Sequence, residues 1–211
     1  TASFFFDESA KVIYVSPKVK GFLGGLSFSP DADENEGEFK QLVQAGLTYE
    51  KYWRQNVFRV GGSYAFANGV SNRLRALALD DLYSYSGGAS VTLDDALTLG
   101  ASFTYNGDSG LPRGPGRPFD SDAFGYAASV NYNKGAWTLG GYYQRAIGEG
   151  DNTASGNDQL QALEMGTSYR VNTRVRIYGA GYFYRLDDEG GSRDSDRFTG
   201  SVFMLGIRLA L

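Results

Sequence analysis

The stretch Leu97-Thr-Leu-Gly-Ala-Ser-Phe-Thr-Tyr105 decides the fold of this chain. Its odd-numbered residues are apolar and its even-numbered residues are polar or very small, which predicts a β-strand with two unlike faces. The stretch ends in a short motif, in which a glycine or alanine is followed by alternating residues up to an aromatic residue. This motif occurs eight times in the chain, at Gly25–Phe28, Gly46–Tyr49, Gly62–Tyr64, Gly100–Tyr105, Ala128–Tyr132, Gly140–Tyr143, Gly166–Tyr169 and Ala180–Tyr184.

The repeated strands predict one large all-β domain over residues 1–211. We expect eleven strands, and their connections alternate strictly between short and long. Short turns at one end and long loops at the other are typical of bacterial outer-membrane barrels. The expected strands are 11–16, 20–29, 39–50, 56–66, 81–93, 97–105, 122–133, 136–146, 159–171, 174–186 and 200–211.

Hydropathy agrees with a barrel and excludes a membrane helix. The mean hydropathy is −0.33, and no stretch reaches the roughly 18 apolar residues that a membrane helix needs. A barrel strand needs only every second residue to be apolar. In the final strand, Phe203, Leu205, Ile207, Leu209 and Leu211 share one face, which we expect to meet lipid. Alternation by itself also fits a soluble β-sandwich.

Aromatic residues collect at both ends of the expected strands, which separates the barrel from the sandwich. Membrane barrels carry such aromatic girdles at the two membrane interfaces. The predicted girdle residues are Phe28, Tyr49, Phe66, Tyr105, Tyr132, Trp137, Tyr143 and Tyr169. We therefore predict an antiparallel transmembrane β-barrel in an outer membrane.

Composition excludes several classes of function. The chain has no His and no Cys, so neither a Ser-His-Asp nor a Cys-His nucleophile can be built, and imidazole cannot bind a metal. A net charge of −4 and a pI near 4.9 disfavour nucleic-acid binding. The paired carboxylates Asp94/Asp95 and Asp187/Asp188 fall at expected turns and strand ends, where Asp is ordinary. We expect no enzyme and no cofactor.

The first expected hairpin resembles a known family. Lys11-Val-Ile-Tyr-Val-Ser-Pro17 and the following Gly21-Phe-Leu-Gly-Gly-Leu-Ser-Phe-Ser-Pro-Asp31 resemble the hairpin after the inward loop of Gram-negative bacterial porins. The resemblance implies a barrel of about 16 strands, of which the eleven expected here are the sixth to sixteenth. Residues 1–10 then correspond to the end of the loop that narrows the pore, and about five earlier strands are absent from this sequence. The alternative is a complete small barrel of 10 or 12 strands with a structural or adhesion role.

The resemblance implies a trimeric outer-membrane porin, a water-filled channel through which ions and small hydrophilic solutes diffuse passively. Its other expected neighbours are membrane lipid and lipopolysaccharide. Asp7 and Glu8, at the end of the expected inward loop, are candidates for the acidic side of the constriction. Side-chain parity alone directs Arg59, Glu164, Arg174, Arg176 and Arg208 into the pore. Such arginines either set ion selectivity or pair with nearby carboxylates and support the wall.

One expected outer loop is strongly acidic. It contains Asp31, Asp33, Glu34, Glu36 and Glu38. This loop is either a solvated charged segment or a site for divalent ions that bridge to lipopolysaccharide.

Overall fold

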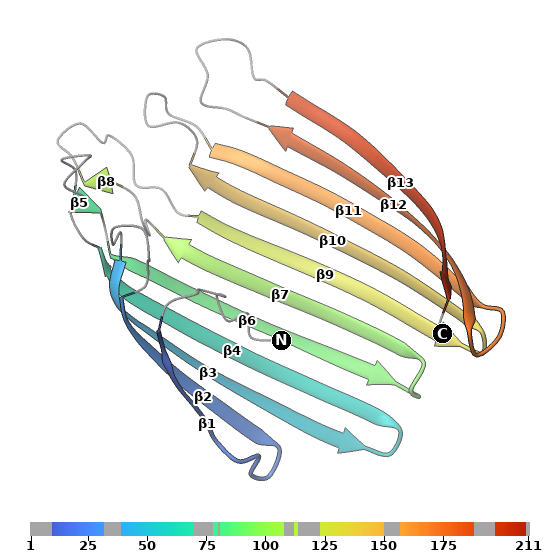
Figure 1. Ribbon diagram of the computed structural model, residues 1–211, viewed down its shortest axis with the longest axis horizontal. Helices are drawn as coiled ribbons and strands as arrows, with labels where there is room; N and C mark the ends of the chain where they lie inside the picture. Colours follow the sequence, from blue (N-terminus) through green and yellow to red (C-terminus); the bar gives the residue numbers. More distant parts are fainter. Residues whose placement is uncertain are drawn as a thin grey trace. The chain divides into compact units, whose positions relative to one another are not determined.

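The structure, a computed structural model, describes residues 10–31, 39–69, 78–79, 81–107, 112–113, 123–149, 157–187 and 197–209. Nearly all of these residues are in β-strands (Figure 1). Among them, no helix is long and apolar enough to cross a membrane. The strands are β1 (Val12–Val15), β2 (Phe22–Asp31), β3 (Phe39–Trp53), β4 (Asn56–Gly69), β5 (Ala78–Leu79), β6 (Leu82–Leu93), β7 (Leu97–Gly107), β8 (Pro112–Arg113), β9 (Ala123–Lys134), β10 (Trp137–Glu149), β11 (Asn157–Arg170), β12 (Val175–Asp187) and β13 (Arg197–Leu209).

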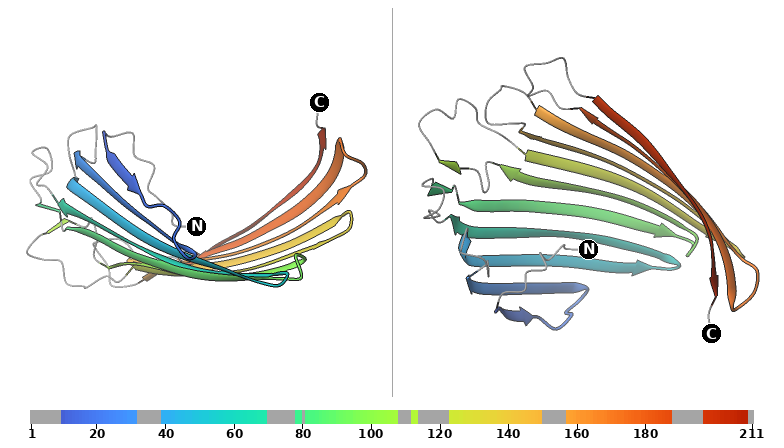
Figure 2. Two further views of the ribbon diagram at one scale, coloured as in Figure 1. Left: turned by 90° about the horizontal axis from the view of Figure 1, so that it is seen from below. Right: turned by 45° about the horizontal axis from the view of Figure 1, so that its top comes forward.

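Eleven strands form one sheet in the order β1-β2-β3-β4-β6-β7-β9-β10-β11-β12-β13, and β5 pairs with β8 in a separate sheet. Each long strand therefore lies beside the strands that precede and follow it in the chain. The registers of β1 to β3 and of β10 to β13 are antiparallel. Figure 2 shows β12 and β13 side by side along their length. The predicted all-β fold with eleven antiparallel strands is confirmed.

The chain forms two compact units. The first contains Thr1–Lys51, Arg59–Gly88 and Phe103–Phe124, and the second contains Tyr52–Phe58, Ala89–Ser102 and Gly125–Leu211. One barrel domain over residues 1–211 stays a prediction, as does the inward loop at residues 1–10, of which residues 1–9 lie outside the described residues.

In the first unit the register separates an apolar face from a polar face. Val12 is paired with Phe28, and Phe22 with Tyr49, on the apolar face. The polar face carries short side chains that bond to one another across strands. The hydroxyls of Ser63 and Ser86 are 2.6 Å apart, and Ser84 donates to Asn106 at 2.7 Å. Ser27 donates to Gln44 at 3.2 Å.

The second unit has the same division, and the predicted face of the final strand is present. On one face of β12 and β13, Ile177 is paired with Ile207, and Gly179 with Leu205. The opposite face pairs Arg176 with Arg208, and Ala180 with Met204. Leu205 is 83% exposed and Phe203 is 72% exposed, so this apolar face is open rather than packed against another layer.

Burial in this structure is the reverse of that in a water-soluble domain. Among the described residues, the only buried apolar side chains are Ala65, Ala67 and Ala162. The buried polar residues are Ser27, Ser29, Gln44, Ser84 and Asp187. Soluble proteins bury their large apolar side chains and expose their polar ones. The described strands therefore require an apolar environment on one side and a polar environment on the other.

The short connections use residues in the left-handed region. Arg54 has φ of 56°, Asp94 and Asp95 have φ of 49° and 54°, and Gly135 has φ of 61°. Asn and Asp tolerate this conformation better than most residues, and Gly adopts it freely. The Asp94/Asp95 pair is therefore part of the tight turn between β6 and β7, as the sequence indicated.

The strands extend further toward the long connections than predicted. β4 continues to Gly69, β10 to Glu149, and β13 begins at Arg197. Some of the extra pairs are polar on both strands, such as Asp187 with Arg197, and the apolar residues among them, such as Ile147 and Phe198, are too few to show the alternation from which a strand could be predicted. β5 and β8 likewise form inside two segments that were predicted as loops.

Candidate functional site

On the apolar face of each unit, aromatic residues gather near the short connections and near the opposite ends of the strands. In the second unit, Trp137 and Tyr169 lie beside the short turns with ring centroids 4.7 Å apart. Tyr143 lies six residues further along β10, toward the long connection, and its ring centroid is 6.4 Å from that of Tyr126. Six strand residues span about 20 Å, which is close to the apolar height of a membrane barrel.

In the first unit, the ring centroids of Phe22 and Tyr49 are 4.5 Å apart near the short connections. Tyr85 lies near the other strand ends, with ring centroids 5.0 Å from Tyr64 and 6.4 Å from Tyr105. Register and alternation place all eight predicted girdle residues on the apolar faces, namely Phe28, Tyr49, Phe66, Tyr105, Tyr132, Trp137, Tyr143 and Tyr169. Their contact with the membrane interface stays a prediction.

On the polar face of the first unit, Arg59 is already neutralised. Its Nε donates to Oε2 of Glu50 at 2.6 Å, and Lys18 forms an ion pair with the same carboxylate. Glu50 therefore lies between two cations, and it ties the turn before β2 to the start of β4. This is the supporting role that we held open for arginines on the polar face.

The polar face of the second unit carries a row of three arginines. Arg170 is paired in the register with Arg176, and Arg176 with Arg208, across three adjacent strands. Arg170 donates to the carbonyl of Gly135 at 3.2 Å. None of the three has an ion pair with a residue that the structure describes. Like charges placed opposite each other destabilise a sheet, so this row is electrostatically poised to attract anions.

A hollow of about 690 Å³ adjoins this row. Its polar lining comes from Arg176, Arg208, Tyr178 and Ser168, and Ile207 and Leu209 complete it at the sheet edge.

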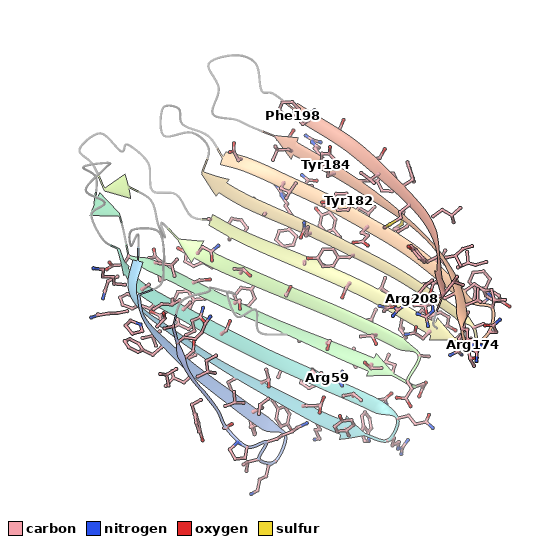
Figure 3. All side chains as sticks on the ribbon, viewed as in Figure 1. Arg59, Arg174, Tyr182, Tyr184, Phe198 and Arg208 are labelled. Carbon is pink, nitrogen blue, oxygen red and sulfur yellow. The ribbon has the colours of Figure 1, made fainter. Side chains whose placement is uncertain are left out.

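The position of Arg174 differs from the prediction, because it lies in the turn between β11 and β12 and not in a strand (Figure 3). The side chain of Asn172 accepts hydrogen bonds from the backbone N–H groups of Arg174 and Val175, at 2.8 and 2.9 Å, which delays the start of β12.

The remaining charged candidates divide between described and undescribed segments. Glu164 lies on the polar face, paired with Tyr142 on one side and Tyr182 on the other. Asp7, Glu8 and residues 32–38 of the acidic loop lie outside the described residues. Asp187 accepts from Arg185 at 2.7 Å and from Arg197 at 2.6 Å, which makes it part of an ion-pair cluster. Within the described part of the chain, no group of three carboxylates could hold a metal ion.

Our sequence reasoning overlooked the tyrosines of the polar face as a group. Tyr142, Tyr178, Tyr182 and Tyr184 all face the side that carries Glu164 and the arginine row. The signal was present in Tyr142-Tyr143 and Tyr182-Phe-Tyr184, because adjacent aromatic residues in a strand must lie on opposite faces. We had assigned a role only to the aromatic residues of the rims, and none to those of the polar face.

These features together define a class of protein. Strands with one apolar, aromatic-rimmed face and one polar face of short side chains are typical of the wall of an outer-membrane β-barrel. The chain belongs to a particular family within that class, the Gram-negative porins, whose family model matches residues 1–189. No curated protein matched the sequence.

Solved porin structures share the fold. The anion-selective porin from Comamonas acidovorans is 15% identical with a TM-score of 0.65, over 95% of this chain and 59% of that one. A porin refined at 1.8 Å resolution is 18% identical with a TM-score of 0.61, over 93% and 60%. The trimer form of OmpT, an outer-membrane protein of Vibrio cholerae, is 13% identical with a TM-score of 0.59, over 95% and 64%.

This chain therefore spans about 60% of the length of the first two solved porins. Family membership confirms the predicted outer-membrane location and the prediction that the protein is not an enzyme. It also confirms the resemblance to Gram-negative porins that the first expected hairpin indicated. The family implies a diffusion channel in the outer membrane, and the trimer form of OmpT shows that an outer-membrane protein of this fold can form trimers.

Proposed function

We propose that the complete protein forms a water-filled channel through which ions and small hydrophilic solutes diffuse passively. The supporting observation is the polar face, which carries many short Ser, Thr, Gly and Ala side chains and on which serine hydroxyls hydrogen-bond across strands, as between Ser63 and Ser86. A polar solute crosses lipid at a large free-energy cost because its hydrogen bonds with water are lost. A wall of small polar side chains leaves room for water and removes most of that cost.

The short side chains also distinguish this proposal from a small structural barrel. Small barrels fill their interior with side chains. Many residues on the described polar faces are too short to fill a lumen, as Gly140, Gly166 and Ala180 illustrate at one level of the second unit. The open channel is therefore the better account of this face.

The ion selectivity of the channel depends on which charged side chains of the polar face have no ion-pair partner. Arg59 is compensated by Glu50, whereas Arg176 and Arg208 have no ion pair with a described residue. An uncompensated charge in a narrow aqueous path changes the local concentration of ions. We propose that Arg176 and Arg208 favour anions, while Glu164, Asp7 and Glu8 contribute negative charge elsewhere along the lining. Arg174 adds positive charge at the mouth formed by the short turns.

We further propose that the complete protein assembles as a homotrimer and contacts lipid and lipopolysaccharide through its apolar face. The trimer form of OmpT supports the first part. Exposed side chains such as Phe203 and Leu205 support lipid contact. The cationic side chains Arg145, Arg185 and Arg197 lie on the same face just beyond the apolar band, where lipopolysaccharide phosphates would meet them.

The test uses the full-length protein in planar lipid bilayers under a salt gradient. The channel should conduct, and Arg176→Glu should shift the reversal potential toward cation preference. Arg145→Glu changes the charge by the same amount on the opposite face, so it should leave the reversal potential unchanged. Absence of conductance in the wild type would contradict the channel. Conduction with an unaltered reversal potential in Arg176→Glu would remove Arg176 from the lining.

A further inference from the structure

Tyrosines and one carboxylate form a cluster on the polar face of β10, β11 and β12. Glu164 is paired in the register with Tyr142 on one side and with Tyr182 on the other. Tyr184 follows Tyr182 on the same face, and their ring centroids are 5.8 Å apart with planes inclined by 32°. Figure 3 shows Tyr182 and Tyr184 together on β12, away from Arg174 and Arg208 at the short-turn end.

Two tyrosine rings of this face lie across glycines of the neighbouring strand. A Cβ atom built on Gly200 would be 2.3 Å from Cζ of Tyr184, and one on Gly206 would be 2.4 Å from Cζ of Tyr178. Each ring therefore occupies the space that a side chain on β13 would take. A ring that rests on the backbone in this way keeps its other side free for contact, and 38% of Tyr184 is exposed.

Polar groups lie among these rings. The hydroxyl of Tyr142 donates to Oε1 of Gln144 at 3.1 Å, and 39% of Tyr142 is exposed. Glu164 is exposed, and it has no hydrogen bond or ion pair with any residue that the structure describes. The cluster therefore offers aromatic surface, a free carboxylate that accepts hydrogen bonds, and an amide that can donate or accept.

These features fit one class of solute. The face of an aromatic ring is electronegative, so it attracts the C–H groups on the face of a sugar ring. The hydroxyls on the rim of the sugar would donate to Glu164 and exchange hydrogen bonds with Gln144 and the tyrosine hydroxyls. A purely apolar solute would leave the carboxylate desolvated without a partner, which is costly. A cationic solute would have to pass the row of Arg170, Arg176 and Arg208.

We propose that Tyr142, Glu164, Tyr182 and Tyr184 form a weak saccharide-binding subsite on the wall of the channel. The proposal rests on the channel function proposed above, because the subsite acts on solutes that pass along the polar face. Successive rings would guide a sugar along the wall, while its hydroxyls exchange partners between water and protein. Weak binding suits transport, because a solute must leave a site as well as enter it.

The test measures current through the full-length channel in planar bilayers while maltotriose is added. Wild-type conductance should fall along a saturating curve, whereas a polyethylene glycol of similar size should produce a fall that does not saturate. Loss of one stacking ring, in Tyr182→Ser or Tyr184→Ser, should raise the half-effect concentration about 2- to 12-fold, the equivalent of an aromatic contact. Tyr182→Phe should retain most of the effect, and Glu164→Gln should weaken it.

Tyr143→Ser is the matched control, because Tyr143 is next to Tyr142 and lies on the apolar face. Its curve should equal that of the wild type. If a tyrosine variant fails to assemble, Gly200→Ala displaces the Tyr184 ring without removing it and should also raise the half-effect concentration. A conducting wild type with no saturating response would overturn the subsite and leave the channel intact. A channel that never conducts would overturn both.

Discussion

Leu205→Arg tests the orientation of the wall more directly than any other single change. Leu205 is 83% exposed on the apolar face of β13. In the register it lies two residues from the level of Tyr169, Ile177 and Ile207. Two residues correspond to about 7 Å of strand, against about 20 Å between the aromatic levels of Trp137 and Tyr143. An arginine here would therefore lie about one third of the way across the apolar band.

Charged residues on the lipid face cost about 2–4 kcal/mol at the bilayer midplane and about 0–1 kcal/mol near the interfaces. At the depth of Leu205 we expect Leu205→Arg to lower the free energy of unfolding by about 2–3 kcal/mol. Met204→Arg is the matched control, because Met204 is the preceding residue and faces the polar side. Its effect should stay within about 0.5 kcal/mol.

The assay is urea unfolding of the full-length protein from short-chain phosphatidylcholine vesicles, followed by tryptophan fluorescence. Equal losses for Leu205→Arg and Met204→Arg would show that depth and face do not matter at this position. A loss confined to Met204→Arg would mean that the two faces are assigned the wrong way round. Either result would refute the reasoning from the register.

Two further predictions concern glycines. Gly21 has φ of 91°, and a Cβ there would lie 2.4 Å from the carbonyl oxygen of Glu50, so Gly21→Ala should lower unfolding free energy by about 1–3 kcal/mol. A Cβ atom on Gly135 would meet no atom within 4 Å, so Gly135→Ala should lower the free energy of unfolding by only about 1 kcal/mol, because of its φ of 61° alone. Both losses are measured in the same urea assay, and equal losses would contradict the steric argument. Gly200→Ala should cost less than about 1 kcal/mol, because the end of the Tyr184 side chain can move away. The displaced ring should lower single-channel conductance, and unchanged conductance would place Tyr184 outside the water path.

Alternation along single strands was enough to predict most of the fold. The faces expected for the final strand, with Phe203, Leu205 and Ile207 on the apolar side, match the observed register. They could be predicted because a period of two assigns every residue of a strand to one face. Strand ends were harder to predict. Beyond the apolar band, pairs such as Asp187 with Arg197 continue the ladder with polar residues on both strands. In a sequence, the polar residues of such pairs predict a loop and not a strand.

The candidate site was harder to predict than the fold. Parity placed Arg59, Arg176 and Arg208 on the polar face, yet it could not distinguish a compensated arginine from a free one. Glu50 and Arg59 are nine residues apart in the chain and meet only because β3 and β4 form a hairpin. The turn residue Asn172 likewise decides that Arg174 lies outside β12, through two hydrogen bonds that no periodicity reveals.

The amino-acid sequence by itself determined the two-faced strands, the alternation of short and long connections, the aromatic residues of the rims and the absence of histidine chemistry. Each of these depends on local pattern or composition. The tertiary structure alone decided which side chains are neighbours across strands. The register brings Arg170, Arg176 and Arg208 into one row, and it lays Tyr184 over Gly200. Register depends on the pairing of whole strands, so no single strand contains that information.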